Sequence, residues 1–274
     1  MLPEVGHLAQ FDLLREWVRH KYPALADSKL GDSEDAGNEA PDSSDEEDEC
    51  SLKMELLPSR VLDVGDSKNS KSLRLYLSHS EGRGERGRYI TLSHCWGNVD
   101  PSVKDKYCTY LCNVKDRFQG IDFDDLPKTF QNAVTVTQEL GIRFLWIDSM
   151  CIIQPHKGCS KRGCDSSYDW SWEGKIMERY YGRSYCTIAA TSTSDSTQGF
   201  LNPRPIRRHV TLNQSSESQL YICKNINNFR NDVEDGPLNQ RGWVLQERAL
   251  SCRTIHFTEN QIYWECGQGI CCET

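Results

Sequence analysis

The sequence predicts an α/β domain with a central, mostly parallel sheet flanked by helices and extended by antiparallel hairpins. Strand and helix patterns alternate between residues 88 and 191, as they do in domains built from strand–helix–strand units. The strand pattern at 143–153 is continuously apolar, which is typical of central parallel strands that are covered on both faces. Pairs of short strand patterns before and after this region indicate the added hairpins.

The first 50 residues predict a helix followed by a linker. Apolar side chains recur about every three positions in 8–20, which predicts an amphipathic helix that either packs on the main domain or binds a partner. These side chains are Leu8, Phe11, Leu14 and Trp17. Residues 27–50 hold eleven acidic residues against one lysine, so we expect a disordered linker. The chain then divides into an N-terminal amphipathic helix (1–26), an acidic linker (27–50) and a main domain (51–274).

The main domain begins with short strand patterns. Residues 59–65 and 72–79 are alternating or apolar runs that predict a hairpin. The polar segment 81–88 predicts a loop, and 88–96 predicts a buried strand rich in β-branched and aromatic residues. We expect the highly charged segment 102–120 to be irregular.

Helix and strand patterns alternate through the rest of the chain. Pro127 at the first turn and Gly141 after the last turn indicate a helix, and 143–153 predicts the strand that follows it. Residues 169–184 predict a helix in which Trp172 is spaced for burial together with Ile176, Met177 and Tyr180. A polar stretch extends to about 238. The other expected elements are a strand at 185–191, a helix at 239–251 and a terminal hairpin formed by 252–258 and 261–266.

Composition excludes several partner classes. The net charge is −8, but residues 27–50 alone carry −10, so the remainder is nearly neutral at +2. A strong attraction to nucleic acid or to an anionic membrane is therefore not expected. No apolar run approaches the roughly 20 residues that a membrane span needs, and the N-terminus lacks a signal-peptide pattern. The 13 cysteines then predict free thiols in a reducing compartment, and we expect a cytoplasmic protein.

Three segments change from an apolar pattern to polar, reactive residue types. They are YITLSHCWG (89–97), LWIDSMCIIQ (145–154) and RGWVLQERALS (241–251). Ligands bind at strand ends in α/β domains, so we expect these segments to form one site.

These segments resemble the three blocks of the fungal heterokaryon-incompatibility (HET) domain in order, spacing and content. The resemblance extends from about residue 56 to 266 and includes DWSWEGKIMERYYGRSYCTIAATS between the second and third blocks. It implies a cytosolic fungal protein whose domain triggers growth arrest or cell death during non-self recognition. The partners it implies are further copies of the chain, other incompatibility proteins or NOD-like receptor proteins.

The HET domain is in turn considered similar to Toll/interleukin-1 receptor (TIR) domains, which have a flavodoxin-like parallel sheet. Some TIR domains hydrolyse NAD with a helical glutamate that follows a Trp-Cys-x-x motif. Here Trp243 precedes Glu247 by four residues, so the resemblance implies that Glu247 is catalytic and that NAD is a substrate. No cofactor is then required, and the chain has no GxGxxG phosphate cradle.

The remaining expected site residues would shape the pocket, and each also has a structural interpretation. They are Ser93, His94, Trp96, Gly97, Asp148, Cys151 and Trp243. The two tryptophans could stack on a ring or pack in the core. Cys151 is either a buried thiol or a nucleophile activated by His94. Glu247 could instead pair with Arg241 or Arg248.

Two further interpretations concern metal binding and a non-enzymatic role. His156, Cys159 and Cys164 lie close together in 155–168, a segment specific to this chain, and Cys266, Cys271 and Cys272 lie near its end. Because two tight Cys-x2-Cys pairs are absent, we expect no metal site. The alternative to catalysis is a packed structural domain that triggers cell death by oligomerising with other proteins.

Overall fold

A computed structural model describes most of the main domain and one helix before it. The described residues are 8–19, 54–65, 73–80, 83–205, 209–213, 219–223 and 226–273. The predicted acidic linker, 27–50, lies outside them. Within these ranges, no helix has both the length and the apolar character needed to cross a membrane.

An eight-stranded mixed sheet forms the centre of the domain, in the order β14-β13-β12-β9-β7-β8-β2-β3. Its strands are β2 Arg60–Asp63, β3 Arg74–Leu77, β7 Tyr89–Ser93, β8 Phe144–Trp146, β9 Cys186–Ala189, β12 Arg253–Phe257, β13 Ile262–Cys266 and β14 Gly269–Cys272. The four central strands, β12, β9, β7 and β8, pair in parallel. The four outer pairings are antiparallel. The expected parallel sheet is thus confined to the centre, because the hairpins contribute as many strands as the parallel region does.

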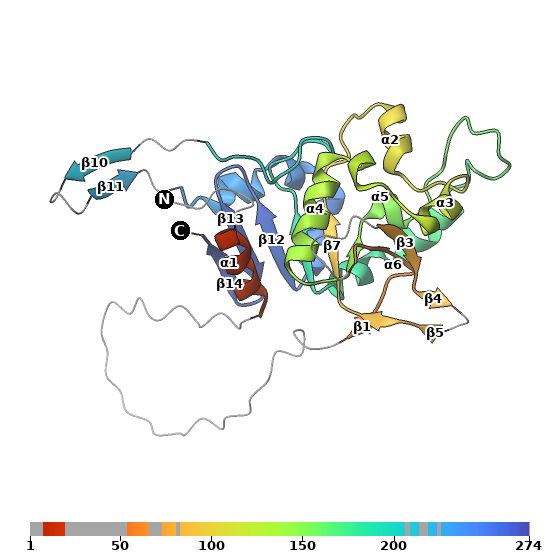
Figure 1. Ribbon diagram of the computed structural model, residues 1–274, viewed down its shortest axis with the longest axis horizontal. Coiled ribbons are helices and arrows are strands. Elements are labelled where there is room, and N and C mark those ends of the chain that lie inside the picture. The colour runs from red at the N-terminus through yellow and green to blue at the C-terminus, as the bar shows by residue number, and fades with distance from the viewer. Residues whose placement is uncertain are drawn as a thin grey trace, which may run out of the picture.

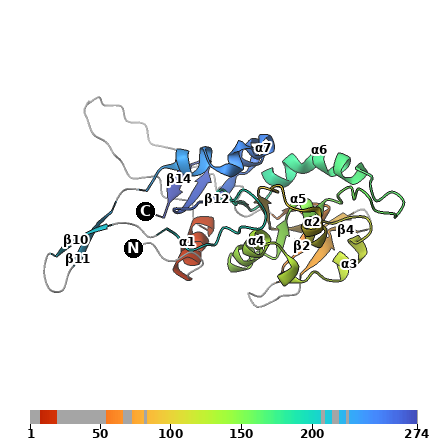
Figure 2. The same ribbon diagram turned by 90° about the horizontal axis from the view of Figure 1, so that it is seen from above.

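Helices cover both faces of this sheet (Figures 1 and 2). On one face lie α1 (Leu8–Arg19) and α4 (Lys128–Glu139), and on the other lie α6 (Tyr168–Gly182) and α7 (Gly242–Leu250). Successive side chains of a strand point to opposite faces, so β7 directs Ile90 and Leu92 towards α4 and its odd-numbered residues towards α6 and α7.

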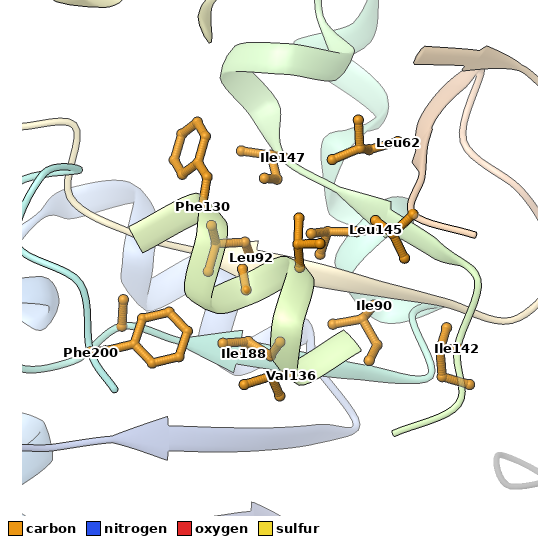
Figure 3. Packing of buried hydrophobic residues seen from close by; sticks show 14 of the residues in the cluster. Leu62, Ile90, Leu92, Phe130, Val136, Ile142, Leu145, Ile147, Ile188 and Phe200 are labelled. Carbon is orange, nitrogen blue, oxygen red and sulfur yellow. The ribbon is translucent and has the colours of Figure 1, made fainter. Parts of the chain in front are cut away.

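The largest core lies between α4 and the sheet. Phe130 and Val136 of α4 belong to the same buried cluster as Ile90, Leu92 and Ile188 of the central strands (Figure 3). The N-terminal helix α1 joins the same core through the buried side chains of Phe11, Leu14, Trp17 and Val18. Of the two interpretations of this helix, packing on the main domain is therefore the one that the structure shows. Leu8, expected on the apolar face, is 68% exposed.

Two segments expected to lack regular structure form short elements. The charged segment 102–120 contains α2 (Pro101–Tyr107) and α3 (Val114–Gln119). Asp100 caps α2 by accepting a hydrogen bond from the backbone N–H of Ser102, and Pro101 occupies the first turn. These capping residues start a helix although the apolar residues of the segment have no helical period. In the expected loop 81–88, β5 (Arg83–Gly84) pairs with β4 (His79–Ser80), and β6 (Arg86–Gly87) pairs with β1 (Glu55–Leu56).

Other boundaries also differ from the sequence-based prediction. The strand predicted at 143–153 ends at Trp146, and the helical turn α5 (Asp148–Cys151) follows it. Trp172, expected to be buried, is 64% exposed on α6. The polar stretch before α7 contains the hairpin of β10 (His209–Asn213) and β11 (Gln219–Cys223). It also contains two short helical turns, Arg230–Glu234 and Pro237–Gln240, and a third, Phe123–Asp125, precedes α4.

Candidate functional site

The order in which the chain adds parallel strands to the sheet reverses at β7. The chain places β8 on one side of β7 and then crosses to the other side to add β9 and β12. In open α/β sheets, the carboxyl ends of the strands at such a switch point form a crevice where ligands bind. Ser93, the last residue of β7, and Ala189, the last residue of β9, lie at this point in register with each other.

Glu247 of α7 is held over this switch point. The hydroxyl group of Ser93 donates a hydrogen bond to its carboxylate. Among the described residues, Glu247 forms no ion pair, because the two neighbouring arginines bind elsewhere. Arg241 donates to the carbonyl oxygen of His94 at 2.7 Å, and Arg248 binds Glu265. The structural interpretation of Glu247 as the partner of either arginine is therefore wrong.

The environment of Glu247 raises its pKa to about 7. Burial is the main cause, since the ionised carboxylate loses its hydration, and the negative charge of Asp148 acts in the same direction. Hydrogen bonds from Ser93 and Tyr181 and the positive charge of Arg241 oppose the shift. At neutral pH this carboxyl group is consequently divided between its protonated and ionised forms, as a group that exchanges protons during a reaction needs to be.

A row of hydroxyl groups joins α7 to the sheet beside Glu247. Thr91 of β7 and Thr187 of β9 hydrogen-bond each other at 2.7 Å, and Thr187 bonds Ser251 at 2.6 Å. Ser251 in turn donates to the carbonyl oxygen of Glu247 at 2.7 Å. The part of the sheet beneath α7 carries these hydroxyl groups, so directed hydrogen bonds help to position the helix that carries Glu247.

A second group of predicted site residues gathers near Asp148. The indole N–H of Trp96 donates to the Asp148 carboxylate at 2.8 Å, and the backbone N–H of Ser149 donates to it at 2.6 Å. His94 lies parallel to Trp96 with ring centroids 6.4 Å apart, and it meets the ring of Phe130 edge-on at 4.9 Å. Asp148 thus orients the aromatic wall and also contributes to the electrostatic field at Glu247.

His94 has an open hydrogen-bonding position. It is buried, and its Nε2 atom has no hydrogen-bond partner among the described residues. Burial lowers its pKa, so the imidazole is neutral at pH 7. A buried polar atom without a partner is uncommon in native structures, and a bound water or ligand is one explanation for it.

The other three predicted site residues have different surroundings. Gly97 has φ +68°, and an added Cβ there would lie 2.2 Å from the Cβ of Asp195, so this glycine permits a close approach of two chain segments. Cys151 packs in the apolar cluster under α6, where burial raises its pKa to about 12. Its thiol therefore stays protonated at neutral pH, which argues against a nucleophilic role. Trp243 is 62% exposed on α7, so its core-packing interpretation is wrong.

A small pocket lies between α7 and the ends of the central strands. Ser93, Ala189, Val244 and His256 are among the residues that line it, and its cavity volume is only about 10 Å³, roughly the space of one water molecule. Ligand pockets usually measure roughly 300–1,000 Å³. A ligand larger than a water molecule therefore requires a displacement of α7 from the sheet.

Sequence reasoning missed Tyr181 and the ion-pair network beside the pocket. Tyr181 was not singled out because the helical pattern of α6 gives it no distinction from its neighbour Tyr180. The guanidinium of Arg248 binds both carboxylate oxygens of Glu265 at 2.7 Å, and His256 bonds the same carboxylate at 2.8 Å. No sequence signal separates these three from ordinary hairpin and helix residues.

Comparison with known proteins identifies the family. No curated protein and no solved structure matches the chain significantly. The family described as heterokaryon incompatibility protein (HET) matches residues 89–247, from the first residue of β7 to Glu247 itself. That match covers more than half of the chain and all three predicted segments up to the carboxylate that the structure places at the switch point. The chain belongs to the heterokaryon incompatibility family, whose domain acts in fungal heterokaryon incompatibility and cell death.

Proposed function

We propose that this chain is a cell-death effector domain that hydrolyses the nicotinamide–ribose bond of NAD, with Glu247 as the catalytic carboxylate. The observation that carries the proposal is the carboxyl group itself. It is held against Ser93 at the switch point, it has no cation paired with it in the described part of the chain, and its pKa is about 7. Carboxyl groups perturbed in this way are found mainly where they are used in chemistry.

The reaction needs little more than such a carboxylate. As the C–N bond breaks, its electron pair leaves with neutral nicotinamide, and the ribose becomes an oxocarbenium-like cation. The ionised form of Glu247 stabilises that positive charge and holds the ribose hydroxyl groups. Water then adds to the ribose carbon and releases a proton, so the products are ADP-ribose, nicotinamide and one proton.

The topology supports the analogy with TIR domains. The parallel strands lie in the order β8-β7-β9-β12, which is second-first-third-fourth along the chain. Flavodoxin-like sheets have the same order and bind their ligand at the same switch point. His94 would donate or accept a hydrogen bond through its open Nε2 atom, and Trp96 would offer a ring face to the base.

The small pocket supports a requirement for activation. A dinucleotide does not fit into a cavity of about 10 Å³, so α7 would have to move outwards before substrate binds. The exposed side chains of Trp243 and Leu245 on α7 offer a surface through which another copy, an incompatibility protein or a NOD-like receptor protein would shift the helix. We therefore expect the isolated domain to be weakly active until it is clustered.

Nicotinamide release tests the proposal. Wild-type protein is incubated with NAD, free and clustered on a scaffold, beside Glu247→Gln and the control Glu178→Gln, an exposed residue of α6. We expect clustering to increase release, Glu178→Gln to match wild type, and Glu247→Gln to lose at least about 100-fold. The proposal is rejected if clustered wild type releases no nicotinamide, or if Glu247→Gln releases it at the wild-type rate.

A non-enzymatic role is the second candidate, and the exposed apolar residues of α7 favour it. Leu245 is 70% exposed and Trp243 62% exposed, on the same short helix. If association alone triggers cell death, Leu245→Asp abolishes toxicity while Glu247→Gln leaves it intact. If catalysis is required, both variants lose toxicity, and Leu245→Asp regains nicotinamide release when it is clustered artificially.

A further inference from the structure

Four potential metal ligands meet at a place distant in sequence from the Glu247 site. Cys112 lies in the turn before α3, and His156, Cys159 and Cys164 lie in the segment between α5 and α6. One ligand atom from each residue falls within 4.8 Å of all the others. No other group of this kind was found in the described ranges of the chain. Three cysteines and one histidine are a standard ligand set for structural zinc.

The ligand atoms are spaced nearly as closely as those of a tetrahedral zinc site. With zinc bonds of about 2.3 Å to sulfur and about 2.0 Å to nitrogen, neighbouring ligand atoms stand roughly 3.5–3.8 Å apart. The Cys112 sulfur is 3.3 Å from Nδ1 of His156. All four ligand atoms lie within 4.8 Å of one another, so the widest pair exceeds the tetrahedral separation by at most about 1 Å.

The histidine is already oriented for metal binding. Its Nδ1 atom faces the sulfur atoms, and its Nε2 atom lies 3.7 Å from a carboxylate oxygen of Asp105. A carboxylate behind a ligating histidine fixes the ring and its tautomer in many zinc sites. The ring of Tyr110 stacks on His156 with centroids 4.2 Å apart, which holds the imidazole plane.

The backbone of the segment folds around the same centre. The N–H of His156 bonds the carbonyl of Cys164 at 2.7 Å, so the two ends of the ligand loop are tied together. Gly158 and Gly163 adopt φ +85° and +79° immediately before Cys159 and Cys164, and these turns direct both thiols inwards. Three basic residues of the same segment carry charge opposite to the net negative charge that three thiolates leave on a bound zinc ion; they are Lys157, Lys161 and Arg162.

We propose that Cys112, His156, Cys159 and Cys164 bind one zinc ion as a structural site. This departs from the sequence-based expectation of no metal, because the fourth ligand, Cys112, lies 44 residues before His156. The site would fasten the loop 155–168 to the segment that supports α5. Thr109 of that segment accepts the N–H of Gln154 at 2.7 Å and donates its own N–H to Ser149 at 3.1 Å, next to Asp148.

Metal content of the full chain tests this proposal independently of any enzymatic activity. The protein is purified under reducing conditions without chelators, and its zinc content is measured by inductively coupled plasma mass spectrometry. We expect about one zinc per chain in wild type and in the control Cys252→Ser, an exposed cysteine outside the group. Cys112→Ser is expected to lose most of the zinc.

Two further measurements remain decisive if Cys112→Ser fails to fold. Titration of wild-type thiols with a mercurial should release zinc in proportion to the thiols modified. Cobalt(II) substitution should produce the visible absorption of a tetrahedral sulfur-rich site. Wild-type protein with less than about a tenth of an equivalent of zinc overturns the proposal. So does a disulfide within the group, detected as a mass two hydrogens lower, or an equal zinc content in Cys112→Ser and Cys252→Ser.

Discussion

Two carboxyl groups, one on α7 and one beside it, are both largely removed from water, yet their acid dissociation constants differ by several orders of magnitude. Glu247 lies on the helix against Ser93, and its pKa is raised to about 7. Glu265 lies on β13, and its pKa is lowered to about 2. Burial opposes ionisation in both cases and is the largest single influence on each. The difference is that Glu265 binds Arg248 and His256, whereas Glu247 binds hydroxyl groups.

This contrast shows how one helix serves two roles. Consecutive residues of α7 point apart, so Arg248 reaches Glu265 on the sheet while Glu247 turns towards β7. The paired carboxylate ties the helix to the terminal hairpin, and the unpaired one is left poised to change its protonation state. Arg248 of this helix therefore pairs with the structural carboxylate, Glu265, and not with the candidate catalytic carboxylate, Glu247.

The two groups affect stability with opposite dependence on pH. Glu265 has a folded-state pKa below its unfolded value of 4.5, so its contribution is present above pH 4.5 and is lost as pH falls towards 2. Glu247 has a folded-state pKa above 4.5, so the folded state binds the extra proton. Its contribution is greatest below pH 4.5 and is lost as pH rises through 7.

The largest effect is expected from Arg248→Ala, which removes the cation from Glu265. We expect a loss of about 3 kcal/mol in the free energy of unfolding at pH 7, because a largely buried carboxylate is left with His256 alone. Urea denaturation measures the loss, and Arg179→Ala, an exposed arginine of α6, is the control. The loss should shrink as pH falls towards 2. An equal loss in Arg179→Ala, or a loss independent of pH, would show that Arg248 acts only through packing.

Glu247→Gln is expected to increase the free energy of unfolding at neutral pH, whereas Arg248→Ala lowers it. Glutamine keeps the shape and cannot ionise, so the variant should gain stability over wild type as pH rises from 4.5 to 8, by about 3 kcal/mol. Urea denaturation at both pH values measures this change, and Glu178→Gln provides the exposed control. A constant difference between variant and wild type across this range would mean that Glu247 ionises as freely as an exposed glutamate. A gain in stability with loss of nicotinamide release would mark a residue retained for function.

The sequence predicts the surroundings of Glu247 better than it predicts the surroundings of Glu265. The strand–helix alternation from β7 to β9 was predictable because apolar residues repeat with the period of each element. The carboxyl ends of parallel strands meet at one edge of a sheet, which is why Trp96 of the first predicted segment reaches Asp148 of the second. Glu247 was singled out by its resemblance to a known motif, and the bond from Ser93, 154 residues away, depends on how α7 is rotated on the sheet.

The sequence does not predict contacts that depend on how a helix is rotated on the sheet, or contacts between residues that are far apart in the chain. Arg248 was a possible partner of Glu247 by proximity in sequence, and only the packing of α7 directs it to Glu265. The helix α2 was missed because charged residues obscure its period, although Asp100 followed by Pro101 is a helix-start signal. Cys112 carries no local pattern that links it to His156.

The smallest predicted effects separate the causes of the raised pKa of Glu247. Ser93→Ala removes a hydrogen bond to the ionised carboxylate, so the pKa should rise, and Asp148→Asn removes a repelling charge, so it should fall. Each shift should be about one unit or less, followed by carbon NMR of the labelled carboxyl group during a pH titration. The two variants control for each other because the expected signs differ. Shifts of the same sign, or none, would mean that burial alone sets this pKa, and that Glu247 and Glu265 differ only in the cation that Arg248 supplies.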